Sequence, residues 1–214
     1  MFFKRSLVTL CAAMAVSMSA QAAFQFELKE VGPDVVLTGS GSFNIAGLTP
    51  RTGFTNGGGF LGPNFPLLQV GASGAPMDVY SVAAVGASTF GTFGFVAAGV
   101  ATGDAIAFAS DLNHVFGPND WRLSVPAGYI SGTQLSGSAT FTGRSFASLG
   151  ITPGTYTWSW GSSIATGDSV TLNAVSAVPE PSSVAMALAG LGVLGVWARR
   201  QKRISQRPAE AAAA

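Results

Sequence analysis

The 214-residue chain has the length of one ordinary domain plus terminal signals, and its 11 basic residues nearly balance its 10 acidic ones. The basic residues gather at the two ends, so the segment 23–178 holds only four bases against eight acids and has a net charge of −4. This distribution leaves no basic face for a nucleic acid, and we expect no nucleic-acid partner.

The N-terminal 22 residues have the three parts of a secretory signal peptide. Lys4 and Arg5 supply the positive charge, residues 7–16 are apolar, and Ala20 and Ala22 form a small-x-small cleavage site. We predict that signal peptidase cuts after Ala22, because a permanent anchor needs roughly 20 apolar residues. The one cysteine lies in this segment, so the mature protein is expected to have no disulfide and no thiolate metal site.

Residues 23–177 are predicted to form an all-β passenger domain. Apolar and polar side chains alternate over residues 24–29, 138–142, 155–160 and 169–174, as in half-buried strands. Glycines interrupt the segment too often for long helices to be stable. An antiparallel β-sandwich is the fold consistent with both observations.

Two connections can be assigned from their turn-forming residues. The first two strands are expected to form a hairpin around residues 31–34, which read Val-Gly-Pro-Asp. Residues 52–66 are rich in Gly and Asn, and we expect a long surface loop there.

The strand over 155–160 leaves two interpretations open. Tyr156, Trp158 and Trp160 share one face and alternate with Thr and Ser, which favours burial in the core. If that face were exposed instead, the three rings could stack on sugars and form a glycan-binding surface.

Candidates for catalysis or metal binding are few. The one histidine, His114, has Asp111 and Asp120 near it in sequence, but no nucleophile elbow or metal-ligand spacing accompanies them, so we interpret this segment as a polar loop. Glu27 and Glu30 would point to opposite faces of a strand and could not act as a carboxylate pair. We therefore expect no enzyme activity, no cofactor and no metal site.

The C-terminal segment combines three elements in a fixed order: an extended triplet, an apolar stretch and a basic cluster. The triplet is Pro179, Glu180 and Pro181, and its prolines disfavour helix. Residues 184–198 contain no charge and are predicted to form a single transmembrane helix. The basic cluster comprises Arg199, Arg200, Lys202 and Arg203.

The predicted helix is short, since 15 residues extend about 22 Å against a hydrocarbon core of roughly 30 Å. Trp197 at the interface and the arginines reaching the headgroups would help it to span. Clustered bases favour the cytoplasmic side, so the passenger domain would lie outside. Residues 204–214 are expected to form a disordered tail.

Residues 178–203 closely resemble the PEP-CTERM sorting signal. Pro179, Glu180 and Pro181 match its recognition triplet, and Arg199 and Arg200 match the basic stop after the helix. Residues 146–161 and 168–172 also look like a block that closes many PEP-CTERM passenger domains, which supports a domain end near Val175.

The resemblance implies a route and a processing enzyme. An exosortase, an integral-membrane cysteine protease, would cut near the triplet and pass the protein towards the cell surface. The family occurs in Gram-negative bacteria, often alongside exopolysaccharide production. We therefore expect transient anchoring in the inner membrane, followed by a cell-surface or extracellular location.

Two functions remain open at this point. The first is a non-catalytic surface or matrix protein associated with exopolysaccharide or biofilm. The second is a carbohydrate-binding or glycan-modifying module that uses the same export route.

Overall fold

The computed structural model describes residues 23–110, 121–161 and 167–176, together with Gly190, Leu191, Leu194, Trp197 and Arg199. The chain divides into two compact units, Met1–Val175 and Ser176–Ala214, which are described separately. The predicted signal peptide, the segment around His114 and the Pro-Glu-Pro triplet lie outside the described residues.

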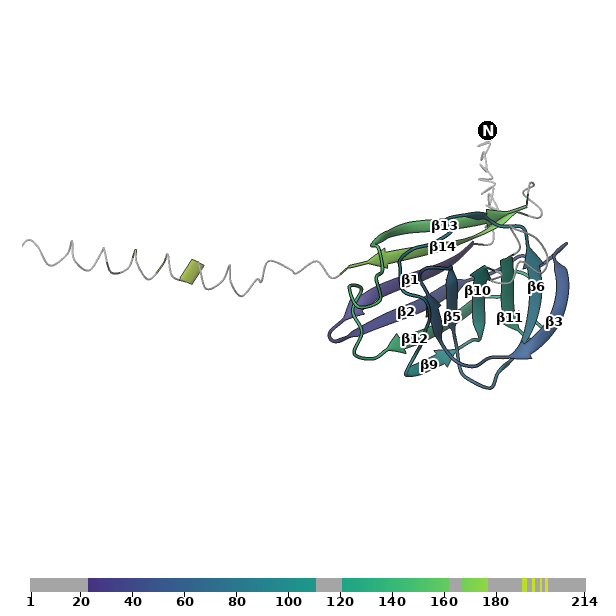
Figure 1. The fold of residues 1–214 in the computed structure, drawn as a ribbon, viewed down its shortest axis with the longest axis horizontal. Helices are drawn as coiled ribbons and strands as arrows, with labels where there is room; N and C mark the ends of the chain where they lie inside the picture. Colours follow the sequence, from purple (N-terminus) through teal and green to yellow (C-terminus); the bar gives the residue numbers. More distant parts are fainter. Residues whose placement is uncertain are drawn as a thin grey trace, which may run out of the picture. The chain divides into compact units, whose positions relative to one another are not determined.

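Within the described part of the first unit, the regular structure consists of strands, so the all-β prediction is confirmed. The strands form two seven-stranded sheets, which Figure 1 shows side by side. In spatial order, sheet A contains β7 (Val85–Gly86), β13 (Gly154–Trp160), β14 (Asp168–Val175), β1 (Ala23–Val31), β2 (Asp34–Gly41), β12 (Leu135–Phe141) and β9 (Val100–Gly103). Sheet B contains β3 (Thr49–Thr55), β6 (Pro76–Val82), β11 (Trp121–Pro126), β10 (Ile106–Ser110), β5 (Leu67–Val70), β4 (Phe60–Gly62) and β8 (Val96–Ala97).

The first and last strands of the domain are neighbours in sheet A, and they run parallel. Phe24 of β1 is paired with Val170 of β14, and Lys29 with Val175. The other pairings between described strands are antiparallel, as predicted. The β1–β14 pair therefore differs from the purely antiparallel sandwich that the sequence analysis expected.

The alternation seen in the sequence determines which side chains enter the core. Phe24, Phe26 and Leu28 of β1 are fully buried, whereas the residues between them point outward. Val31 pairs with Asp34 across the predicted hairpin, whose turn contains Gly32 at a φ of 59°. Glycine adopts this left-handed conformation without the steric cost that a Cβ atom would add.

Aromatic side chains from both sheets meet in the core between them. The ring of Phe108 on β10 lies 5.1 Å from that of Trp121 on β11 and 5.6 Å from that of Trp158 on β13, measured between centroids. Trp158 is completely buried, and its Nε1 donates a hydrogen bond of 2.7 Å to the carbonyl of Ala87. A core side chain of this size stabilises a fold by about 3–5 kcal/mol relative to alanine.

The expectation of a long surface loop over residues 52–66 is wrong. β3 continues to Thr55 and pairs with β6 through a register shift between Arg51 and Phe54, and β4 pairs with β5. The glycines here permit close contact instead of marking a loop. A Cβ atom added to Gly59 would collide with the methyl group of Ala139.

Asn56 is the second reason why this segment is ordered. Its side chain is 1% exposed, and Nδ2 donates to the carbonyls of Gly71 and Ala72 at 3.0 and 2.9 Å. Oδ1 accepts a hydrogen bond from Nε2 of the buried Gln69. The amide therefore satisfies backbone carbonyls in the turn between β5 and β6 that would otherwise be buried without donors.

We predict that Asn56→Ala lowers the free energy of unfolding by about 2–4 kcal/mol, because it leaves several buried polar groups without partners. Urea denaturation monitored by tryptophan fluorescence measures this loss. Asn173→Ala is the matched control, since Asn173 accepts its hydrogen bond from Thr155 on the outer face of sheet A and should cost less than about 1 kcal/mol. Equal losses in the two variants would contradict the assigned role of Asn56.

Candidate functional site

The predicted sorting residues are only partly covered by the structure. Arg199 has helical backbone and an exposed side chain. Pro179, Glu180, Pro181, Arg200, Lys202 and Arg203 lie outside the described residues, as do Ala20 and Ala22 at the predicted signal-peptide site.

In the second unit, Gly190, Leu191, Leu194, Trp197 and Arg199 have helical backbone. Leu191, Leu194 and Trp197 are 60–65% exposed. Among the residues that can be described, no helix has the length and apolar character needed to cross a membrane. The transmembrane helix over 184–198 therefore stays a prediction.

In the sequence, the described strands of the domain lie between the two predicted cleavage sites. β1 begins at Ala23, directly after the predicted signal-peptide cut, and β14 ends at Val175, before the Pro-Glu-Pro triplet. Both strands are central in sheet A, where β14 lies between β13 and β1. Cuts at these two positions would leave the sheet complete.

The aromatic strand β13 contributes its rings to the core. Trp158 is 0% and Trp160 5% exposed, whereas Tyr156 is partly buried and its hydroxyl donates to the carbonyl of Thr152 at 2.8 Å. Trp158 is enclosed by the core, with its ring 5.6 Å from that of Phe108, so it has no face free for a sugar. This placement agrees with the core interpretation and gives no support to glycan stacking on the two tryptophans.

The carboxylates considered in the sequence have separate structural partners. Glu27 forms a 2.8 Å ion pair with Lys29, whereas Glu30 accepts a hydrogen bond from the backbone N–H of Phe146. Asp104 accepts from the N–H of Ser136. Among the described residues, no group of three or more His, Cys, Asp or Glu side chains could hold a metal ion. Asp111, His114 and Asp120 lie outside the described residues.

Asp168 is the most perturbed carboxylate of the described domain. It is 6% exposed at the start of β14 and accepts hydrogen bonds from the backbone N–H groups of Asn44 and Ser169 at 2.8 and 2.7 Å. Burial raises the pKa of Asp168 to about 6, although the two N–H donors act in the opposite direction. The side chain fixes the segment after β2 against the first residues of β14.

A hollow of about 570 Å³ lies over β3, β6 and β11 of sheet B, and the sequence analysis did not predict it. Its lining combines two arginines, three hydroxyl side chains and three apolar residues: Arg51, Arg122, Thr49, Thr52, Ser81, Pro50, Phe54 and Val79. The loop expected over residues 52–66 excluded the pairing of β3 with β6 that forms this surface, and the two arginines are far apart in the chain. The one signal available in the sequence was that basic residues are rare in segment 23–178, where Arg51 and Arg122 are two of only four.

Residues 177–203 match a family model described as the PEP-CTERM protein-sorting motif. The resemblance noted in the sequence is thereby confirmed, and the chain carries this motif directly after its β domain. The motif implies sorting to the cell exterior with an exosortase as the processing partner. No curated protein and no solved structure matches the chain.

We predict that Asp168 makes the stability of the domain fall as the pH rises. Its carboxyl has a pKa of about 6 when folded, against an ordinary 3.8, so its protonated form is favoured by folding. This contribution is fully present below about pH 4 and is lost as the pH rises through 6.

Urea unfolding of the unmodified protein and of Asp168→Asn between pH 4 and 7 tests this prediction. The variant keeps an acceptor oxygen for one of the two N–H donors, so it is less stable at every pH. Because it cannot ionise, its stability relative to the unmodified protein should rise with pH. Asp34→Asn is the control, since Asp34 accepts one N–H, from Gly143, at the end of a hairpin. Parallel pH profiles for the unmodified protein and Asp168→Asn would refute the assignment.

Proposed function

We propose that this chain is an exported surface or extracellular-matrix protein whose C-terminal signal is processed by an exosortase-like protease. The observation that carries the proposal is the sorting motif at residues 177–203, placed immediately after a domain whose last strand ends at Val175. Because the last described strand ends before the motif begins, removal of the motif would leave the described strands intact.

The proposed route has two processing steps. Signal peptidase removes residues 1–22 during passage through the inner membrane of a Gram-negative bacterium. The short apolar segment 184–198 and its basic cluster then hold the protein in that membrane until the second cut. The two prolines of the triplet favour an extended backbone, which would suit a protease cleft, and Glu180 supplies the single charge to be recognised.

We further propose that the mature domain is non-catalytic and associates with exopolysaccharide in a biofilm. The outer face of sheet A supports this, since hydroxyl and amide side chains form cross-strand pairs over it. Thr102 lies 3.0 Å from Ser138, and Thr157 lies 3.2 Å from Thr171, measured between side-chain oxygens. Such a face is well hydrated and can exchange hydrogen bonds with polysaccharide hydroxyls.

The alternative is a carbohydrate-binding module that uses the same export route. The hollow over β3, β6 and β11 favours it, because arginines and hydroxyls converge there beside an aromatic ring. The buried tryptophans of β13 do not contribute to this alternative.

Intact mass of the protein recovered from the cell envelope and from the medium tests the route. We predict loss of residues 1–22 and of everything beyond the Pro-Glu-Pro triplet. Glu180→Ala should slow the C-terminal cut, so that a larger species accumulates in the membrane fraction. Glu27→Ala is the matched control, because it removes one glutamate from a surface ion pair worth at most about 1 kcal/mol.

Retention of the C-terminal segment in the unmodified protein would make it a stably anchored protein and would overturn the proposed processing. Release of Glu180→Ala at the normal rate would show that the triplet charge is not recognised.

A further inference from the structure

The hollow on sheet B lies over a row of side chains that face outward from β3, β6 and β11. In the register of the sheet, Ser81 of β6 lies between Thr49 of β3 and Arg122 of β11, and Val79 lies opposite Arg51. Successive strands are about 4.8 Å apart, so β3 and β11 are separated by roughly 10 Å. Two long arginine side chains starting from this separation can direct their guanidinium groups at one small ligand.

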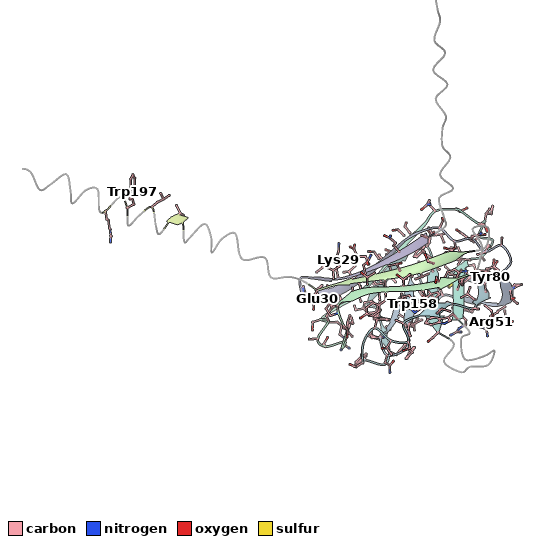
Figure 2. The ribbon with its side chains drawn as sticks, turned by 90° about the horizontal axis from the view of Figure 1, so that it is seen from above. Lys29, Glu30, Arg51, Tyr80, Trp158 and Trp197 are labelled. Carbon is pink, nitrogen blue, oxygen red and sulfur yellow. The ribbon has the colours of Figure 1, made fainter. Side chains whose placement is uncertain are left out.

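The local charge favours an anion. Arg51 and Arg122 both line the hollow, and none of its described lining residues is acidic. The acid next to these residues on β6 is Asp78, which the strand alternation directs to the other face, where it accepts the N–H of Gly128 at 2.8 Å. In Figure 2, Arg51 lies at the end of the domain away from Lys29 and Glu30.

Arg122 also has an unused hydrogen-bond donor. Its Nε is buried and has no hydrogen-bond partner among the described residues. Leaving a buried charged donor unsatisfied is costly, and such groups in native proteins usually indicate a missing partner.

The remaining lining residues suit the ring of a sugar. Phe54 is 42% exposed, which is unusual for a phenylalanine and leaves ring surface available for the C–H face of a pyranose. The hydroxyls of Thr49, Thr52 and Ser81 can donate to and accept from sugar hydroxyls.

We propose that this hollow binds an acidic saccharide, with the carboxylate of a hexuronate residue between Arg51 and Arg122 and its ring against Phe54. Guanidinium groups bind carboxylates through paired, charge-assisted hydrogen bonds, which separates uronates from neutral sugars. The inference deepens the carbohydrate-binding alternative given under the proposed function, on which it depends for the source of the ligand, by naming the class of saccharide that the hollow recognises.

Isothermal titration of the exported protein with trigalacturonate tests the inference, with its methyl ester as the matched ligand. The ester keeps the rings and hydroxyls but loses the negative charges. We expect saturable binding of the acid, with affinity about tenfold or more above that of the ester, and weakening as salt is raised. Equal affinity for the two ligands, or no saturable binding of the acid, would overturn the site.

Variants locate the binding on the protein. Arg51→Gln and Arg122→Gln should each weaken trigalacturonate binding by about tenfold. Arg144→Gln is the matched control, because Arg144 is exposed and does not line the hollow, and its affinity should be unchanged. Equal affinities in all three variants would place the ligand elsewhere and refute the proposal. Should either hollow variant fail to fold, the comparison of acid and ester on the unmodified protein still decides.

Failure of this inference can be distinguished from failure of the proposed function. Processing is measured by intact mass and does not involve the hollow, so Arg122→Gln should be cut and released normally. If the protein is processed correctly but does not bind trigalacturonate, the acidic-saccharide site is refuted and the proposed sorting route is unaffected.

Discussion

The contact between the two sheets depends on a small group of aromatic rings. Phe108 and Trp121 of sheet B stack nearly parallel, at 13°, and Trp158 of sheet A lies within 5.9 Å of both ring centroids. A chain with its one cysteine in the predicted signal peptide has no disulfide to hold its sheets together, so this packing must hold them. The same contact fixes β11, and therefore the position of Arg122 on the opposite face of that strand.

Sequence periodicity predicted the strands but not their partners. Alternation identified the buried faces of β1, β12, β13 and β14, because each strand covers one side of a core and presents the other to solvent. The segment 52–66 was misassigned because Gly and Asn usually occur in loops. Asn56 instead uses its amide to satisfy a buried turn, which is a tertiary contact that no local pattern records.

The sorting motif and the hollow also differ in how far local sequence predicts them. The sorting motif is contiguous, so its residues could be recognised from the sequence. The hollow joins Arg51 and Arg122 only through the registers of β3, β6 and β11, which depend on long-range pairing. Asp168 is one of the eight acids of segment 23–178, and its elevated pKa comes from burial, beside the segment that contains Asn44.

The parallel pairing of β1 with β14 links completion of the fold to the order in which the chain emerges. A protein delivered N-terminus first presents β1 at once, but the neighbour of that strand arrives only after every other strand has crossed. One edge of β1 stays open until then, and pairing between such distant segments is slow. Sheet A can therefore be completed, by the pairing of β14 with β1, only when the residues leading into the sorting motif have reached the same compartment.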